Sequence, residues 1–307
     1  MRAVVLGAAA GGGFPQWNSH AEACRRARAG DPRAISRSQA SLAISGDGER
    51  WFLINASPDL REQIQARAFL HPRRDLRSSP IEGVILTGAD VDAIAGLLHL
   101  RERQPFTIQA SERVLAVLRA NPIFGVLAEG YVRREAVKLG QPFEPRHVDG
   151  SGSGLRVELF DVPGKVALYM EAGDAAHELA GKPGDTVGVE VRADGHRLIY
   201  IPGCAAMTDG LKRRLAGASV VLFDGTLWQD DEMIVRGLGP KTGKRMGHMS
   251  VSGPDGTIAA FRDIAVKRRI LVHINNSNPI LLEESEERAM LSKEGWEVAY
   301  DGMEVSP

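Results

Sequence analysis

Apolar residues in the first half of the chain occur in short runs, and helical spacing follows them. Runs bounded by turn residues predict strands at Ala3–Leu6, Ser41–Ile44, Trp51–Ile54 and Gly83–Leu86. Apolar positions three and four residues apart then predict helices at Asp92–Leu100, Ser111–Leu118 and Ile123–Leu127. In this half, strands therefore precede helices.

Glycine-rich turns dominate the middle of the chain, around Asp149–Gly154 and Ala180–Asp185. The apolar runs beside these turns predict strands that pair as hairpins, at Arg156–Phe160, Val166–Met170, Thr186–Val191 and Arg197–Ile201. Strands and helices then alternate, with strands at Ser219–Phe223, Ile270–Ile274 and Glu297–Tyr300 and helices at Thr257–Val266 and Leu281–Leu291.

The order of strands before helices, repeated twice, predicts an α/β (α+β) sandwich. Two mixed sheets would pack face to face with helices outside, an αββα arrangement whose functional loops gather at one rim. Because no linker divides the chain and no period repeats, we expect one domain over residues 1–307.

Composition narrows the classes of function. The chain has 307 residues, and its 38 basic and 39 acidic side chains give a net charge of −1, which offers no general attraction for a nucleic-acid backbone or an anionic membrane. Aromatic residues are not interleaved with Lys and Arg, so a platform for single-stranded nucleic acid is not expected either.

The chain has two widely separated cysteines, and its opening segment lacks a signal-peptide pattern, so we expect a reduced, cytoplasmic protein. No apolar run approaches the length of about 20 residues that a membrane span requires, so we expect no integral membrane protein.

Two glycine- or cysteine-containing segments near the start carry weak signals. Gly11–Gly13 follow a strand, but Phe14 and Pro15 come next instead of an amphipathic helix, so we predict a surface loop and no dinucleotide site. The segment Ser19–Cys24 holds one thiol and one imidazole, whereas a structural zinc normally takes four such ligands. We expect a loop with an incidental cysteine.

Carboxylates alternate where the strand before Thr87 gives way to a helix. Asp90 and Asp92 lie in this turn, and two carboxylates at a strand end can bind a hard cation. Asp is also a common helix N-cap, so the residues alone leave both interpretations open.

Polar side chains also follow later strands. Phe223–Thr226 ends one strand and contains Asp224, His248 lies in a glycine-rich loop, and His273 ends another strand beside amide and hydroxyl residues. A single histidine is usually structural, but this convergence favours His273 as a functional residue. We interpret the other histidines outside these segments as structural or solvated, namely His71, His99, His147, His177 and His196.

The segment Leu86–Leu97 resembles the Thr-His-x-His-x-Asp-His-x-x-Gly signature of the metallo-β-lactamase superfamily. Thr87, Asp92 and Gly96 are in register, while Gly88, Asp90 and Ala93 occupy the three histidine positions. With five further motifs, the chain resembles the coenzyme PQQ synthesis protein B family over essentially its whole length; these motifs are Gly11–Asn18, Asn55–Arg61, Tyr200–Cys204, Met246–His248 and His273–Asn276.

This resemblance implies the metallo-β-lactamase-like αββα four-layer sandwich and a role in making pyrroloquinoline quinone (PQQ). One view of the family is an iron-dependent oxygenase that hydroxylates the tyrosine ring of the excised Glu–Tyr precursor. The other is a carrier of the quinone or its precursor toward the periplasm. The precursor and other PQQ biosynthesis proteins are the implied partners, and a homodimer is left open.

The resemblance also implies residue roles. Asp90, Asp92 and His273 would hold a metal with open coordination positions, which suits Fe(II) and dioxygen. Zinc, a further candidate in purified protein, has no redox chemistry. His248 resembles a proton donor of related RNA-processing nucleases, with Asp224 orienting it. The implied substrate contacts are Thr226, Asn275, Asn276 and Ser277.

Two departures from the family pattern matter. The family usually has His after the second Asp, where this chain has Ala93, and losing a ligand predicts a weak or empty metal site. The family's Cys-x-Cys-x-x-Cys zinc motif is replaced at Ser19, Ala21 and Cys24, so we expect no structural zinc. A zinc hydrolase is disfavoured because the signature histidines are replaced.

Overall fold

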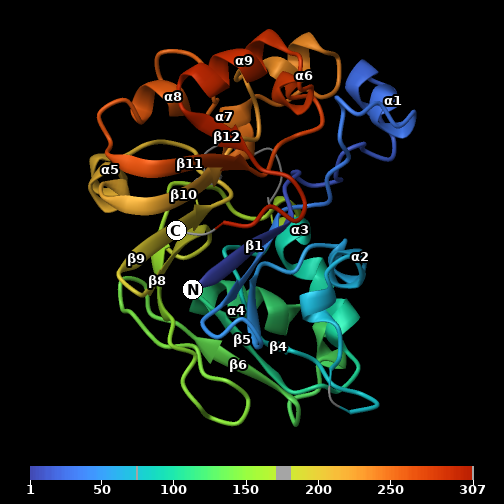
Figure 1. Ribbon diagram of the computed structural model, residues 1–307, viewed down its shortest axis with the longest axis vertical. Coiled ribbons are helices and arrows are strands. Elements are labelled where there is room, and N and C mark those ends of the chain that lie inside the picture. Colours follow the sequence, from blue (N-terminus) through green and yellow to red (C-terminus); the bar gives the residue numbers. More distant parts are fainter. Residues whose placement is uncertain (74, 171–180, 306–307) are drawn as a thin grey trace.

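The computed structural model describes residues 1–73, 75–170 and 181–305, and its strands form two sheets (Figure 1). The first sheet has the order β1-β2-β3-β4-β5-β6, with bounds Arg2–Gly7, Ser41–Ser45, Trp51–Ile54, Ile81–Ile85, Phe106–Ala110 and Val132–Ala136. The first three strands are antiparallel, and β3 to β6 run parallel.

The second sheet has the order β12-β11-β10-β9-β8-β7. In chain order, β7 to β12 span Arg156–Asp161, Val187–Ala193, His196–Ile201, Ala218–Asp224, Val266–Val272 and Trp296–Val298. The hairpin strands β7 to β9 are antiparallel, and β9 to β12 are parallel. The central strand β10 is buried at every position, as its continuous apolar sequence requires for a strand covered on both faces.

Nine α-helices within the described residues lie outside the sheets. They are α1 (Glu22–Arg28), α2 (Leu60–Gln65), α3 (Val91–Ile94), α4 (Glu112–Ala120), α5 (Asp209–Leu215), α6 (Glu232–Val235), α7 (Gly243–Met246), α8 (Thr257–Ala260) and α9 (Glu286–Lys293). Short 3₁₀ helices span Ala68–Leu70, Ala95–Leu100, Pro122–Val126, Leu168–Met170 and Pro279–Leu281.

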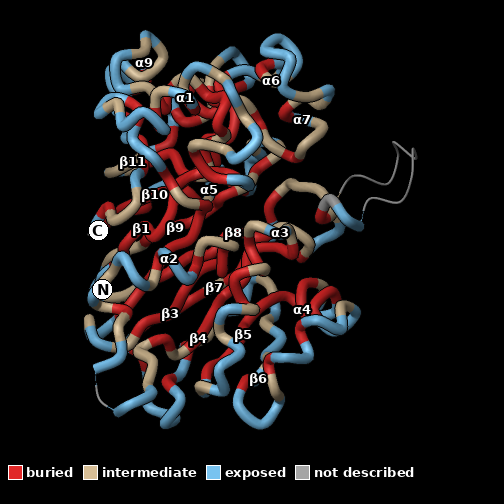
Figure 2. The backbone as a smooth tube through the Cα atoms, turned by 90° about the vertical axis from the view of Figure 1, so that its right-hand side faces the viewer, coloured by how far each residue is buried: buried red, intermediate tan, exposed pale blue. Residues whose placement is uncertain are grey.

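Three hydrophobic clusters define the layers. One lies between the sheets and takes Ile44, Val189 and Leu222 from their inner faces. A second packs α4 against the first sheet, and a third packs α5, α8 and α9 against the second. Figure 2 shows the buried backbone concentrated along the strands of both sheets. The predicted αββα sandwich is therefore confirmed.

The segment after β1 joins the rims of the two sheets. Ile274, just beyond β11, donates its N–H to the Ala8 carbonyl at 3.0 Å, and Ala10 donates to the Ile274 carbonyl at 2.9 Å. Ala9 also forms a bridge to Gln39 beside the first sheet. These backbone bonds place the end of β11 opposite the loops of the first sheet.

Several predicted helix boundaries were wrong. The helix predicted at Asp92–Leu100 is α-helical only to Ile94 and then 3₁₀. The N–H of Gly96 in the 3₁₀ segment donates to the Ala56 carbonyl at 2.8 Å, a bond outside the helix. The helix predicted at Thr257–Val266 ends at Ala260, because Val266 already pairs with Ala218 in the sheet.

Other predicted elements also changed. The strand predicted at Val166–Met170 gives way to a 3₁₀ helix at Leu168–Met170, and the helix predicted at Ile123–Leu127 is also 3₁₀. The expected loop at Ser19–Cys24 becomes helical at Glu22, which buries Cys24 against Asn276. The start of the turn predicted at Ala180–Asp185 and His177 lie outside the described residues.

Candidate functional site

Three strand ends meet beside one cavity. The cavity has a volume of about 500 Å³, and its wall includes Asp90 and Asp92 after β4, Thr226 after β10 and His273 after β11. His248, from the loop after α7, lines it as well. The structure thus brings together the metal candidates and the proton-donor candidate that the sequence predicted.

His273 is held between the two sheets. Its Nε2 lies 2.8 Å from Asp92 Oδ2 across 181 residues of sequence, and its Nδ1 lies 2.8 Å from Thr226 Oγ1. The residue adopts φ 56°, a left-handed conformation that is uncommon for non-glycine residues and is frequent at functional sites. This backbone turn ends β11 at Val272 and directs the ring toward Asp92.

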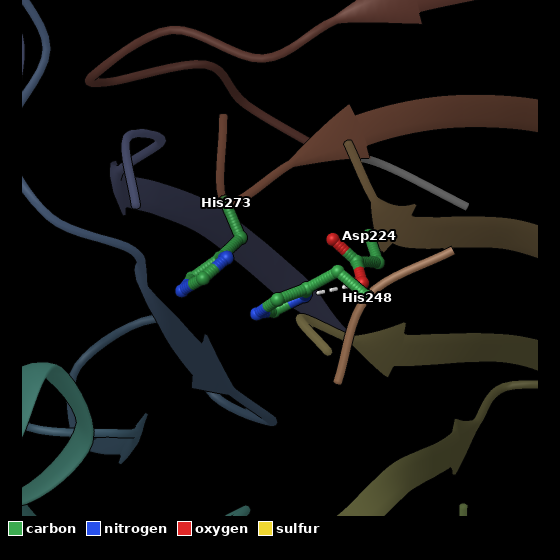
Figure 3. A group of neighbouring side chains, drawn as sticks. All are labelled: Asp224, His248 and His273. Carbon is green, nitrogen blue, oxygen red and sulfur yellow. Dashed lines mark hydrogen bonds and ion pairs between the residues drawn. The ribbon is translucent and has the colours of Figure 1, made fainter. Parts of the chain in front are cut away.

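Asp224 and His248 form a second pair. His248 Nδ1 lies 2.7 Å from Asp224 Oδ2, and the Cys204 N–H donates to the same oxygen at 2.8 Å. Figure 3 shows both imidazole rings extending in the same direction, with one nitrogen of each on the side away from Asp224. The ring centroids of His248 and His273 are 5.1 Å apart, and the rings are stacked.

Thr226 connects the two pairs. Its hydroxyl has one hydrogen, and its shortest contact is 2.6 Å to Asp224 Oδ1. If the hydroxyl donates there, it accepts the N–H of His273 Nδ1, and the Nε2–H of His273 donates to the Asp92 carboxylate. A metal ion would bind His273 through Nε2 in place of that proton. Metal-bound histidines are commonly oriented by such a hydrogen bond to the other ring nitrogen.

Burial and charge act against each other in this cluster. Burial alone would lower the pKa of His273, but the hydrogen bond and charge of Asp92 outweigh it and raise that pKa. Burial would raise the pKa values of Asp92 and Asp224, yet their contacts with His273 and His248 respectively lower both. The charged forms of both acids are therefore favoured by histidine partners.

The side chains fit a divalent cation. Among the described residues, Asp224, His248 and His273 each offer a ligand atom, and these atoms lie within 4.8 Å of one another. Asp92 adds a carboxylate beside His273. Asp90 lines the same cavity but lies outside that close group. Carboxylate oxygens and imidazole nitrogens suit metals such as iron, manganese and zinc.

The predicted substrate contacts separate in the structure. Thr226 and Asn275 line the cavity, whereas Asn276 and Ser277 are buried behind it. Ser277 Oγ donates to Glu232 Oε1 at 2.5 Å, and Asn276 contacts Gln16 and Cys24. The last two side chains stabilise the surrounding loops, and substrate binding by all four residues stays a prediction.

Asn55 begins one of the motifs that carry the family resemblance, but the sequence analysis gave it no role in the site. It has φ 64°, its Nδ2 donates to Thr87 Oγ1 at 2.9 Å, and its Oδ1 accepts the Thr87 N–H at 2.9 Å. Both residues line the cavity. Asn tolerates the left-handed conformation better than most residues, but only the fold shows that it holds the start of the loop that carries Asp90.

The remainder of the cavity wall comes from several loops. Lys165 and Lys241 were not predicted and add two cationic side chains. Ala93 lines the wall beside Asp92, where it presents a methyl group. The other lining residues are Ala10, Gly11, Ala40, Gly88, Gly164, Thr186, Pro202, Gly203, Met233, Gly239, Pro240, Met246 and Gly247.

Three of the histidines predicted to be structural or solvated have contacts outside the cavity. His147 is buried against the Phe52 ring, and His99 and His71 contact backbone carbonyls. Cys24 and Cys204 are free and buried. No helix in the described ranges is both long and apolar enough for a membrane crossing.

Comparisons with known proteins agree over nearly the whole chain. A β-lactamase superfamily domain matches residues 50–274. Coenzyme PQQ synthesis protein B of Gluconacetobacter diazotrophicus is 57% identical, and the match covers 99% of this chain and 98% of that protein. The protein of that description from Methylorubrum populi is 53% identical, with 99% of both chains covered.

Solved structures show the same fold. The crystal structure of Zn²⁺-bound PqqB from Methylobacterium extorquens superposes with a TM-score of 0.95 and 52% identity, and all of both chains is covered. A diphosphatase of the PhnP family gives a TM-score of 0.68 at 18% identity, with 100% of this chain and 97% of that one covered. The second likeness concerns the fold alone.

Proposed function

This chain belongs to the coenzyme PQQ synthesis protein B family of the β-lactamase superfamily, and we propose that it hydroxylates the tyrosine-derived ring of a Glu–Tyr precursor of PQQ. The observation that carries the proposal is the meeting of Asp92 and His273 at 2.8 Å on the wall of a cavity of about 500 Å³. Small-molecule sites commonly have volumes of about 300–1,000 Å³. The cavity is therefore large enough for a dipeptide-sized substrate.

Asp92 and His273, with Asp90 on the same wall, would hold the metal. Asp224 is a further candidate ligand because it lies in the close group with His273. Fe(II), when bound, would supply oxygen activation, which redox-inert zinc does not provide. The Methylobacterium extorquens structure is of Zn²⁺-bound PqqB, which supports metal binding within the family and makes zinc a second candidate occupant.

The overall reaction replaces an aromatic C–H bond with C–OH. One oxygen atom of dioxygen enters the ring, and the other leaves as water after taking up two protons and two electrons from an external reductant. His248 is suited to the proton transfers, because Asp224 binds its Nδ1 and leaves Nε2 as the exchanging atom. Thr226 and Asn275 would bind polar groups of the precursor.

Ala93 favours a second candidate function. It stands on the cavity wall where the family usually has a histidine, so this chain offers one ligand fewer beside Asp92. A weakly metallated protein would bind PQQ or its precursor without turnover, as a carrier does. Calorimetry with PQQ on metal-free protein tests this candidate, and the lack of measurable heat would contradict it.

Oxygen consumption tests the hydroxylase. Protein reconstituted anaerobically with Fe(II) should consume oxygen with a Glu–Tyr diamino acid and an external reductant, and the product should gain one oxygen atom by mass. An Asp92→Ala, His273→Ala double variant should lose this activity. A matched Asp263→Ala, His20→Ala variant of exposed residues should retain it. Normal turnover by the first variant would refute the assignment.

A further inference from the structure

Two lysines on the cavity wall have no role in the proposed chemistry. Among the described residues, the titratable ones that line the cavity are Asp90, Asp92, Lys165, Lys241, His248 and His273. The acids and histidines belong to the metal and proton machinery, whereas the lysines come from loops elsewhere in the fold. Their ammonium groups are suited to binding anions.

Lys165 has a fixed place in the wall. Its carbonyl accepts the Thr186 hydroxyl at 3.2 Å, and its Nζ donates to the Val166 carbonyl at 3.2 Å. Its aliphatic stem packs on Gly247, where an added Cβ would lie 2.9 Å from Lys165 Cγ. Gly247 precedes His248, so the stem of Lys165 lies close to the proton-transfer residue.

Lys241 enters the wall from the loop between α6 and α7. Thr242, the next residue, caps α7 by accepting the Arg245 N–H at 3.2 Å. Gly239, two residues earlier, lies against Met233, whose sulfur is 3.1 Å from Asn275 Nδ2. The loop that carries Lys241 is therefore anchored by a helix cap and by a contact with the strand-end residues.

The charges on the wall favour an acidic ligand. Two ammonium groups offset the carboxylates of Asp90 and Asp92, and a divalent cation held by those acids would make the cavity positive. A Glu–Tyr compound carries several carboxylates and an aromatic ring. The apolar part of the wall, which includes Met233 and Met246, can contact such a ring.

We propose that Lys165 and Lys241 bind carboxylates of the substrate and make the cavity selective for acidic Glu–Tyr compounds. The inference rests on the proposed substrate class but not on hydroxylation, because a carrier would need the same recognition. Lysine would act here as a point charge on a flexible stem, so arginine should preserve much of the attraction.

Calorimetry on metal-free protein tests the proposal without turnover. The probes are the Glu–Tyr dipeptide and its C-terminal amide, and the variants are Lys165→Met, Lys241→Met and Lys165→Arg. The methionine variants should raise the Kd of the dipeptide at least tenfold, and at least one of them should leave the Kd of the amide within twofold. Lys165→Arg should stay within threefold of the unmodified chain.

Lys244→Met is the control, because Lys244 is exposed on α7 and does not line the cavity. Its Kd values should match those of the unmodified chain. The proposal would be overturned if both methionine variants bound the dipeptide as well as the unmodified chain does. It would also be overturned if both variants lost affinity equally for the dipeptide and the amide, or if the unmodified chain did not bind the dipeptide. If the methionine variants lost dipeptide binding as expected but the unmodified, Fe(II)-loaded protein consumed no oxygen, the lysine proposal would stand and only the hydroxylase function would be rejected.

Discussion

Replacing Asp224 by asparagine should destabilise the metal-free protein strongly. The carboxylate is fully buried, and each of its oxygens has two partners. Oδ1 accepts the N–H and O–H of Thr226 at 3.0 and 2.6 Å, and Oδ2 contacts the Cys204 N–H and His248 Nδ1 at 2.8 and 2.7 Å. Asparagine has one oxygen and one NH₂ group, so it can accept from only one of these two sets.

The magnitude follows from the contacts that are lost. Whichever way the amide of Asp224→Asn is turned, its NH₂ group faces groups that donate to the carboxylate in the unmodified chain. An unsatisfied buried donor costs about 1–3 kcal/mol, and hydrogen bonds to a charged group lie at the upper end, so losing the acceptor for two donors costs several kcal/mol. We therefore expect the free energy of unfolding to fall by about 3–5 kcal/mol at pH 7.

Chemical denaturation followed by circular dichroism measures this difference, with a chelator present to keep the protein free of metal. Asp263→Asn is the matched control, because Asp263 is exposed and such surface changes usually alter stability by less than about 0.5 kcal/mol. A loss below about 1 kcal/mol for Asp224→Asn would refute the reasoning. It would mean that the hydrogen bonds to this carboxylate do not stabilise the rim.

Two further predictions concern a buried acid and the metal site. The side chain of Glu190 is 1% exposed, and its carboxylate lies 2.6 Å from Arg192 and 2.9 Å from Arg197. Burial would raise the pKa of Glu190, but the contacts with the two arginines lower it. Glu190→Gln should therefore reduce the free energy of unfolding by about 2 kcal/mol at pH 7. The stabilisation by ionised Glu190 is fully present above the pKa of about 4.3 that the residue has in the unfolded chain, and it is lost as the pH falls through the lower pKa of the folded state. Chemical denaturation measures it as the difference in unfolding free energy between the unmodified chain and Glu190→Gln, and a difference that stayed constant from pH 7 to 3 would contradict the prediction. Ala93→His should tighten Fe(II) or Zn²⁺ binding by at least about 10–100-fold in a competition titration with a chromophoric chelator, and unchanged affinity in folded protein would argue against a metal at Asp92.

Strong apolar patterns allowed much of the fold to be predicted. The strand predicted at Ser219–Phe223 is β10 apart from one residue at each end, since every position of this strand is buried. By contrast, β6 was missed because its sequence is largely polar and exposed. The strand predicted to reach Ile274 ends at Val272, because the left-handed backbone of His273 depends on contacts with the other sheet.

The candidate site was only partly visible in the sequence. Asp92 and His273 were predicted because each follows an apolar strand and matches a family motif. Lys165 and Lys241 belong to no motif, and their positions depend on loops that approach one another only in the folded chain. The burial of Ser277 could not be predicted either, because its hydroxyl donates to Glu232, which is 45 residues away in the sequence.

The backbone bonds that join Ala8 and Ala10 to Ile274 have a consequence for synthesis of the protein on the ribosome. The acidic loop after β4 emerges long before His273, so the nascent chain carries its carboxylates without the imidazole that completes the cluster. Contacts of such large sequence separation form late. Metal capture by the complete cluster should therefore follow synthesis of nearly the whole chain.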